Sequence, residues 1–406
     1  MPFVSQIAHD SAIQTATGLQ AGLKNFARAS FGRLLDLLPG LIALVGAFLV
    51  SAFILLTLDA DPIKAFSAMW SGAFGNENAT ANTLTKATPI LFVAIGITVA
   101  FRGGVINIGG EGQMITGALA GSAITLSLGD ELGFWVIPLA LLAAFLAGGF
   151  FGAIAGFLKA QFDVNEILST IMLNQVAVQL MNYLLNGPML DPTKVGTNHV
   201  PETARIVDAA KIPRFRLPLA DHLLFDRTSL HWGLILAVLM AVVIYIFMWK
   251  TTFGFRIRAV GYKERAARYA GINVKQQMVL SMFLAGGLSG LAGIVQVLGL
   301  TYRLKTDGSP AGFTGNAGFN GIVVALFGGL TPLGAIPASV FFGGLLVGAQ
   351  KMQREIQGAS SLITSINGII VVFVVASQIF ILRRARRRVG GEIDAQTILP
   401  TEETNA

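Results

Sequence analysis

Residues 107–114 read NIGGEGQM, a short segment with three glycines, two amide side chains and one carboxylate between long apolar runs. Within a membrane, non-helical backbone is tolerated only where protein or a water-filled cavity satisfies its polar groups. We therefore predict a broken helix that restarts near Glu111. Such breaks are found beside the substrate sites of transporters.

Glu111 itself has two interpretations. As a first-turn acid at the cytoplasmic interface it would be stabilised by the helix dipole, and Arg102 nearby favours this reading. As an intramembrane carboxylate it would face a translocation pathway, because ionisable residues inside membranes mark such paths. The residues alone leave both readings open.

The composition is that of a membrane protein. Of 406 residues, 53% are hydrophobic and only 13% are charged, whereas soluble domains carry about a quarter charged residues. The absence of cysteine excludes disulfides and thiol catalysis, and the four histidines form no ligand pair, so we expect no metal and no other cofactor. The net charge of +7 fits basic residues beside membrane spans, and we expect no nucleic-acid partner.

A membrane-crossing helix needs about 20 mostly apolar residues, and runs of that kind recur along the chain. Residues 308–350 carry no charge and are broken by GGLTPLGAIP (328–337), so they form two spans, or one span and a re-entrant pair. We predict an all-α polytopic membrane protein with about ten transmembrane helices, interrupted near 107–114 and 318–334. The expected spans are 38–58, 87–101, 110–128, 134–158, 166–185, 231–249, 277–300, 318–329, 333–350 and 361–382.

Basic residues set the expected orientation. Seven of them lie in 250–275 and five in the RRARRR run at 383–388, which places both termini in the cytoplasm. The chain then divides into a cytoplasmic or interfacial segment, a membrane domain with one external loop and one cytoplasmic loop, and a tail. Their bounds are 1–36, 37–382, 186–230, 250–276 and 383–406.

Two of these parts have alternative roles. Within the first segment, residues 12–36 form either an amphipathic interfacial helix or a basic tail. The proline-rich external loop either caps the bundle or meets an external partner. Repeated small-x-x-x-small spacings predict closely packed helices. They are Gly117/Gly121, Gly148/Gly152/Gly156, Gly286/Gly290 and Gly344/Gly348.

Polar residues also mark FDVNEILSTIMLNQ (162–175). Asn165 is a good helix N-cap and Glu166 a good first-turn residue. Asn174 and Gln175 lie about two turns further in, where an amide either joins helices or lines a path.

Two further segments interrupt the apolar background. RIRAVGYKERAARYAGINV (256–274) predicts a short helix at 263–270, capped by Gly271, which is either a contact for another protein or an ordinary basic loop. In 316–349, Asn316 and Asn320 accompany glycines and prolines that form either a pathway-lining break or a tight turn.

Several common catalytic motifs are missing from the sequence. The chain has no G-x-x-x-x-G-K-[ST] loop for ATP, no H-E-x-x-H and no G-x-S-x-G. We therefore expect no enzyme activity in this chain. A stand-alone secondary transporter or channel for a small polar solute stays an alternative, as does a membrane scaffold.

Taken in order, four segments resemble the permease subunits of bacterial ATP-binding-cassette importers in the branched-chain amino acid/ribose superfamily. In particular they are similar to nucleoside and simple-sugar permeases that are paired with basic-membrane-protein-type lipoproteins. The segments are NIGGEGQM (107–114), VNEILSTIMLN (164–174), RAVGYKERAARYAGIN (258–273) and GFNGIVVALFGGLTPLG (318–334). Lys263 stands where that family usually shows asparagine.

The resemblance implies a permease in the bacterial cytoplasmic (inner) membrane that translocates a nucleoside or a simple sugar. It implies an ABC ATPase subunit that hydrolyses ATP, a second and non-identical permease, and an external lipoprotein as partners. The predicted pathway residues are Asn107, Glu111, Gln113, Asn174, Gln175, Asn316 and Asn320, and the resemblance implies that 107–114 and 318–334 flank the path. The implied ATPase-coupling residues are Arg258, Gly261, Glu264, Arg268 and Gly271, to which the small-residue side of the short helix adds Ala266 and Ala267.

Overall fold

The computed structural model describes most of the chain between residues 45 and 356. The described residues are 42, 45–57, 59–194, 196, 200–215, 217–219, 222–225, 228–356, 365, 368, 369, 372, 373 and 376. The predictions for 1–36 and 383–406, and most of the span predicted at 361–382, lie outside them. The chain forms two compact units, Leu58–Asn367 and a second one that joins Met1–Thr57 to Gly368–Ala406. The site described below lies in Leu58–Asn367.

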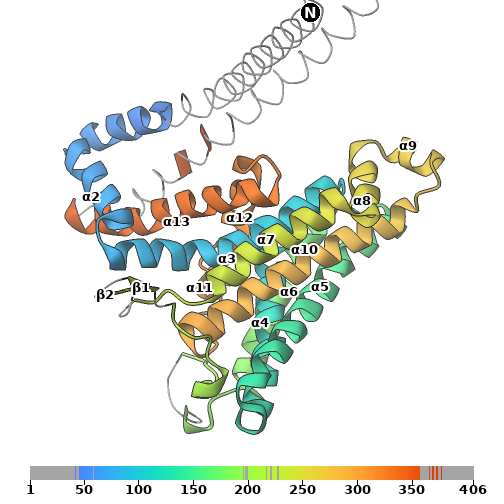
Figure 1. Cartoon of the computed structure of the whole chain (residues 1–406), viewed down its shortest axis with the longest axis horizontal. Helices are drawn as coiled ribbons and strands as arrows, with labels where there is room; N and C mark the ends of the chain where they lie inside the picture. The colour runs from blue at the N-terminus through green and yellow to red at the C-terminus, as the bar shows by residue number, and fades with distance from the viewer. Residues whose placement is uncertain are drawn as a thin grey trace, which may run out of the picture. The chain divides into compact units, whose positions relative to one another are not determined.

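Helices make up nearly all of this unit (Figure 1). The main ones are α2 (Pro62–Phe74), α3 (Glu77–Arg102), α4 (Gly110–Leu132), α5 (Val136–Phe162), α6 (Glu166–Leu185), α7 (Gly233–Lys250), α8 (Thr252–Tyr262), α9 (Glu264–Tyr269), α10 (Val274–Gln296), α11 (Pro310–Thr314), α12 (Ala317–Phe327) and α13 (Pro332–Glu355). Short helical turns are η1 (Gly133–Trp135), η2 (Pro192–Lys194), η3 (Asp208–Ala210) and the π-helical η4 (Val297–Thr301). A small antiparallel hairpin pairs β1 (Leu217–Leu219) with β2 (His222–Leu224).

The described residues confirm the all-α membrane class. Five helical segments are long and apolar enough to cross a bilayer. They are Glu77–Arg102, Gly110–Phe162, Gly233–Lys250, Val274–Thr301 and Pro332–Glu355, with α12 as a shorter apolar helix. The break predicted at 328–337 is also present, because α12 ends at Phe327 and α13 begins at Pro332.

The span predicted at 87–101 begins ten residues earlier than expected. Its helix α3 starts at Glu77, where the Asn76 side chain accepts a hydrogen bond from Ala79 N. The first ten residues of α3 are too polar to be recognised as part of a span by hydropathy. In the structure, threonine hydroxyls of this helix form hydrogen bonds with backbone carbonyls. Thr83 donates to the carbonyl of Ala73 at 2.8 Å and Thr88 to that of Leu84 at 2.9 Å. Consequently Lys86 lies inside a membrane-length helix rather than beside one.

Glycines bring α4, α5 and α10 into direct backbone contact. A Cβ atom on Gly290 would lie 2.2 Å from the Ala144 carbonyl oxygen, and one on Gly117 would lie 2.3 Å from Gly290 Cα. Gly148 and Gly286 face each other as closely. The close packing predicted from the small-residue spacings is confirmed, and it is the means by which helices associate where lipid removes the hydrophobic driving force.

The unit has two distinct ends. Figure 1 shows α8 and α9 projecting at the ends of α7 and α10, which we call the α9 end, and the segment with β1 and β2 at the other, which we call the loop end. At the loop end, residues 200–215 bond to the chain that leaves α10. Thr203 N donates to Leu304 O at 3.0 Å, and Ile212 N donates to Leu298 O at 3.0 Å. The loop therefore caps the bundle, which is one of its two predicted roles.

Glu202 fastens this cap. Its side chain is 4% exposed and forms ion pairs with Lys194, Arg303 and Lys305. Burial alone would raise the pKa of the Glu202 carboxyl, but the hydrogen bonds from Lys194 and Arg303 outweigh it and leave the pKa below its ordinary value. Glu202 thus stays ionised and holds the cap closed.

Candidate functional site

The segment NIGGEGQM forms a helix break inside the bundle. Helix α3 ends at Arg102, residues 103–109 turn back, and α4 begins at Gly110. Gly110 packs against Val93 of α3, where a Cβ would lie 3.1 Å from a Val93 methyl. Because Val93 lies nine residues before the end of α3, the restart is about 14 Å along that helix from Arg102. The predicted break and the first-turn position of Glu111 are confirmed, and Glu111 lies well inside the bundle rather than level with Arg102.

Buried amide side chains satisfy the backbone of this break. Asn107 and Gln113 pair through two hydrogen bonds of 2.9 and 3.0 Å, and Asn107 Oδ1 also accepts from Gly109 N. From α6, Asn174 Oδ1 accepts from Gly112 N at 2.8 Å, while its Nδ2 donates to Ile108 O at 3.1 Å. None of the three amides is more than 3% exposed. They provide the protein-supplied hydrogen bonds that an interrupted membrane helix needs.

Glu111 caps a different helix from its own. The carboxylate is 1% exposed, and its Oε1 accepts from the backbone N of Phe319, in the first turn of α12. Asn316, the residue before α12, supplies no side-chain cap. A carboxylate at a helix N-terminus satisfies otherwise unpaired donors and complements the dipole. One acid therefore serves two helix starts, because Glu111 lies in the first turn of α4 and its carboxylate accepts from the first turn of α12.

Arg102 holds the other end of α12. Its Nε donates to Leu330 O at 2.9 Å and its Nη2 to Gly329 O at 3.3 Å. Both carbonyls belong to the turn that follows the helix, where Gly329 and Leu330 adopt positive φ angles of 68° and 51°. Helix α12 is thus fixed at its start by Glu111 and at its end by Arg102.

The remaining predicted pathway residues lie apart from this network. Gln175 is exposed on α6, although its neighbour Asn174 is buried. Asn316 is exposed and follows Gly315, and these two residues have left-handed φ angles of 61° and 59°. Asn320 is half-buried on α12. The structure therefore brings together Asn107, Glu111, Gln113 and Asn174, and leaves Gln175 outside.

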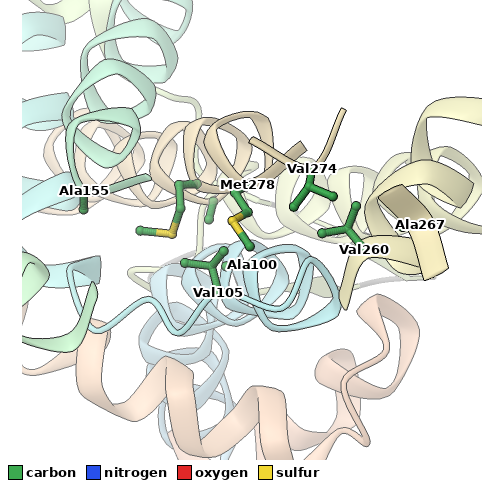
Figure 2. Close-up of a cluster of buried hydrophobic side chains, with 9 residues drawn as sticks. Ala100, Val105, Ala155, Val260, Ala267, Val274 and Met278 are labelled. Atoms are coloured by element: carbon green, nitrogen blue, oxygen red, sulfur yellow. The ribbon is translucent and has the colours of Figure 1, made fainter. Parts of the chain in front are cut away.

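Predicted coupling residues lie in α8, in α9 and beside it. Figure 2 shows Ala267 of α9 and Val260 of α8 in one buried cluster with Ala100, Val105 and Val274. Glycine is required at position 261, because a Cβ there would lie 2.1 Å from the Arg102 carbonyl oxygen. These contacts join α8 and α9 to the start of the helix break.

Other members of this group face outward or support α8. Glu264 and Arg268 form an exposed ion pair at 2.8 Å, and Ala266 is exposed. Arg258 donates from Nε to Met248 O at 2.9 Å. Gly271 has a φ of 77°, which confirms it as the residue that ends α9. Two tyrosines at the α9 end were not predicted from the sequence as functional residues. Tyr262 is 92% exposed and Tyr269 is 95% exposed.

Residues 79–384 match a protein family described as the permease component of branched-chain amino acid transport systems. The chain belongs to this family. It is a multi-pass membrane permease.

Three relatives illustrate the range of this family. The permease is 36% identical to a guanosine ABC transporter permease of Bacillus subtilis over 345 residues, which is 85% of this chain and 94% of that protein. It is 32% identical to a glucose ABC transporter permease of Haloferax volcanii over 361 residues, covering 87% and 90% of the two chains. It is 32% identical to a second guanosine permease of the same Bacillus strain over 262 residues, covering 64% of this chain and 79% of that protein. No solved structure is significantly similar.

A cavity of about 180 Å³ with polar and apolar wall residues lies toward the loop end of the permease. Its walls come from α3, α10 with η4, α13 and residues 229–231. Lys86 of α3 is one wall residue, which the sequence reading missed because the run of apolar residues began only at position 87. Among the described residues, no cluster of three or more histidines and acids that could hold a metal is found here or elsewhere.

His231 forms part of the cavity wall and is only 2% exposed. Its ring is packed between Gly233 and Gly299, where a Cβ on either glycine would lie within 2.6 Å of an imidazole atom. Nδ1 accepts a hydrogen bond from Gly233 N at 3.1 Å. Burial lowers the pKa of His231 from 6.5 to about 4, so the imidazole is neutral at physiological pH.

The stability of the permease should consequently fall as the pH drops below about 6.5. Between pH 6.5 and 4 the unfolded chain binds a proton at this histidine while the folded chain does not, and the loss reaches about 3 kcal/mol near pH 4. We expect His231→Asn, which keeps an acceptor at the position of Nδ1, to weaken this pH dependence. Thermal unfolding in detergent from pH 4 to 8 measures it, and identical slopes for wild type and variant would contradict the assignment.

Proposed function

We propose that this permease is the membrane-spanning subunit of an ATP-driven ABC importer for a nucleoside, with a simple sugar as the alternative. The observation that best supports this proposal is the similarity of the chain to a guanosine permease over 94% of that protein. The similarity to a glucose permease supports the alternative. We place the protein in the bacterial cytoplasmic membrane with the α9 end inside, because seven basic residues lie in 250–275.

Three partners follow from this function. An ABC ATPase would bind at the α9 end and hydrolyse ATP, so that this chain performs no catalysis and binds no cofactor. A second, non-identical permease would complete the pathway, and the similarity to two different guanosine permeases of one strain supports such a pair. An external lipoprotein would deliver substrate to the loop end, where residues 200–215 cap the bundle.

The structure suggests how the ATPase would act on the pathway. We assign Ala267 and Gly261 to anchoring, because one is buried and the other lies against Arg102. The exposed side of α9, with Glu264, Arg268 and Tyr269, would receive the ATPase. Movement of α8 and α9 would then reach the helix break through Arg102, with Asn107, Glu111 and Gln113 beside the path.

Reconstitution tests the proposed function. Proteoliposomes that hold this permease, its ATPase and its second permease, with the lipoprotein added outside, should take up guanosine when ATP is present inside. Uptake of glucose instead of guanosine would select the alternative substrate. Uptake driven by an ion gradient with this chain alone would contradict the proposal and identify a secondary transporter or channel.

Removing the two exposed tyrosines should weaken ATPase binding. We expect Tyr262→Ala with Tyr269→Ala to raise the dissociation constant tenfold or more, because truncating a central interface aromatic costs about 2 kcal/mol. Binding of the purified ATPase to the permease in nanodiscs measures this. Tyr183→Ala is a matched control, since this tyrosine is 71% exposed on α6. Equal dissociation constants for all three proteins would remove the tyrosines from the interface.

A further inference from the structure

The cavity beside Lys86 has the character of a binding site rather than a packing defect. Four of its wall residues on α3 are Asn82, Thr85, Lys86 and Pro89, which recur at the spacing of one helix face. From the opposite side α13 contributes Gln350, and α10 contributes Gln296. A void left by imperfect packing is typically apolar, whereas eight of the twelve residues that line this cavity carry an amide, hydroxyl, imidazole or ammonium group.

Lys86 has unused hydrogen-bond donors. Among the described residues it forms no hydrogen bond and no close ion pair, and Glu111 is the charged group with which it interacts electrostatically. Its Nζ lies near Gly315, where a Cβ would be 2.6 Å away, in the turn between α11 and α12. An ionisable side chain inside a membrane span is costly and marks a functional site. The three donors of this ammonium group are therefore available to a ligand.

The same cavity also offers an unused acceptor and one further donor. Pro89 has no N–H, so the Thr85 carbonyl four residues earlier lacks its helical partner. His231 adds a donor, because its Nδ1 already accepts from Gly233 N and the Nε2 of the neutral imidazole therefore carries the proton. The π-helical turn η4 brings Leu300 to the wall, and such turns occur often at functional sites. Donors, acceptors and a few apolar groups on facing walls match a ring that carries several hydroxyl groups.

Charge and size narrow the ligand further. Because Glu111 offsets the charge of Lys86, the site suits a neutral molecule rather than an anion. Its volume of about 180 Å³ is below the roughly 300–1,000 Å³ of pockets that enclose a drug-sized ligand. The space therefore fits one sugar ring, and not a nucleoside with its base.

We propose that this cavity binds the sugar ring of the transported molecule, with Lys86 donating to ring hydroxyls and the Thr85 carbonyl accepting from them. The inference rests on the proposed import of a nucleoside or simple sugar. It assigns a contact within one permease chain, on the route between the loop end and the turn that begins α12.

The chain contains no cysteine, so an introduced one reports on the cavity without background from this subunit. We take Ser229→Cys, at the cavity wall, and Ser127→Cys, exposed on α4 away from it, as a matched pair. In the complete importer, saturating guanosine or ribose should slow labelling of Ser229→Cys by a small thiol reagent about tenfold, and guanine alone should not. Labelling of Ser127→Cys should stay unchanged.

Uptake gives a second measurement on the same complex. We expect Lys86→Met to reduce guanosine uptake tenfold or more while ATPase binding is kept. Lys351→Met is the control, because Lys351 lies next to Gln350 on α13 but donates to Ser71 of α2 instead of lining the cavity.

The outcomes separate the two proposals. Wild-type vesicles that import neither guanosine nor glucose would overturn the proposed function and this inference with it. Normal import, together with unprotected Ser229→Cys and an active Lys86→Met variant, would overturn the cavity assignment alone. Protection by ribose 5-phosphate but not by ribose would show an anion site and would also overturn it.

Discussion

Replacing Gly290 by alanine should prevent stable assembly of the helix bundle. The added Cβ would lie 2.2 Å from the Ala144 carbonyl oxygen and 3.2 Å from Gly148 Cα, both in α5. Because both obstacles are backbone atoms, no side-chain rotation relieves them, and α10 would have to move away from α5. Overpacking of this kind costs about 1–3 kcal/mol and sometimes more. Thermal unfolding and the yield of monodisperse protein in detergent measure the loss.

Gly344→Ala provides the matched control for this prediction. Gly344 is also helical, but a Cβ there would have the tip of the Phe74 ring as its nearest neighbour, at 3.0 Å, and that ring is able to shift. Alanine is favoured over glycine in a helix by about 0.5–1 kcal/mol, so this variant should unfold at the wild-type temperature or above it. If Gly290→Ala and Gly344→Ala behaved alike, backbone contact between α4, α5 and α10 would not be what holds the bundle.

Replacing Glu111 by leucine should nearly abolish transport while the protein still assembles. Leucine removes the acceptor for Phe319 N and leaves buried donors unpaired at the start of α12. Each unpaired buried donor costs about 1–3 kcal/mol, which corresponds to roughly a five- to 150-fold loss in the population of the correctly placed helix. Uptake in proteoliposomes, and hydrogen exchange of the amides in 315–327, measure the two consequences.

Glu111→Gln separates capping from a direct role in the pathway. The amide oxygen still accepts from Phe319 N, so protection of α12 from exchange should return to near the wild-type level and uptake should recover in part. If glutamine reduced uptake as much as leucine but left exchange unchanged, the negative charge itself would be required, and capping would not explain the residue.

Local chemistry made part of this structure predictable from sequence. The glycines of NIGGEGQM, the cap at Asn165 and the terminator Gly271 each act on their own neighbourhood, and all three are found as expected. The partner of Glu111 could not be predicted, because Phe319 is 208 positions away. Nor could the depth of Lys86, because α3 begins earlier than its hydropathy indicates and Thr83 donates to the Ala73 carbonyl of the preceding helix.

The side of each helix that faces the protein interior could not be predicted from the sequence either. Asn174 and Gln175 are adjacent amides, yet one is buried in the break and the other is exposed. In a soluble protein the apolar stripe would distinguish them, but lipid and protein interior are equally apolar in a membrane. Likewise α9 is too short to reveal its register, so Ala266 and Ala267 could be told apart only by their surroundings.

The ten residues from Arg102 to Glu111 link α8 to α12. At one end of this segment the Arg102 backbone packs against Gly261 of α8. The side chains of Arg102 and Glu111 form hydrogen bonds with the backbone at opposite ends of α12. A rigid-body tilt of α8 therefore moves α12 as well, unless a contact made by Gly261, Arg102 or Glu111 breaks. Motion of α8 at the surface of the protein would thus be transmitted to α12, a half-length helix in the interior, through a segment of only ten residues.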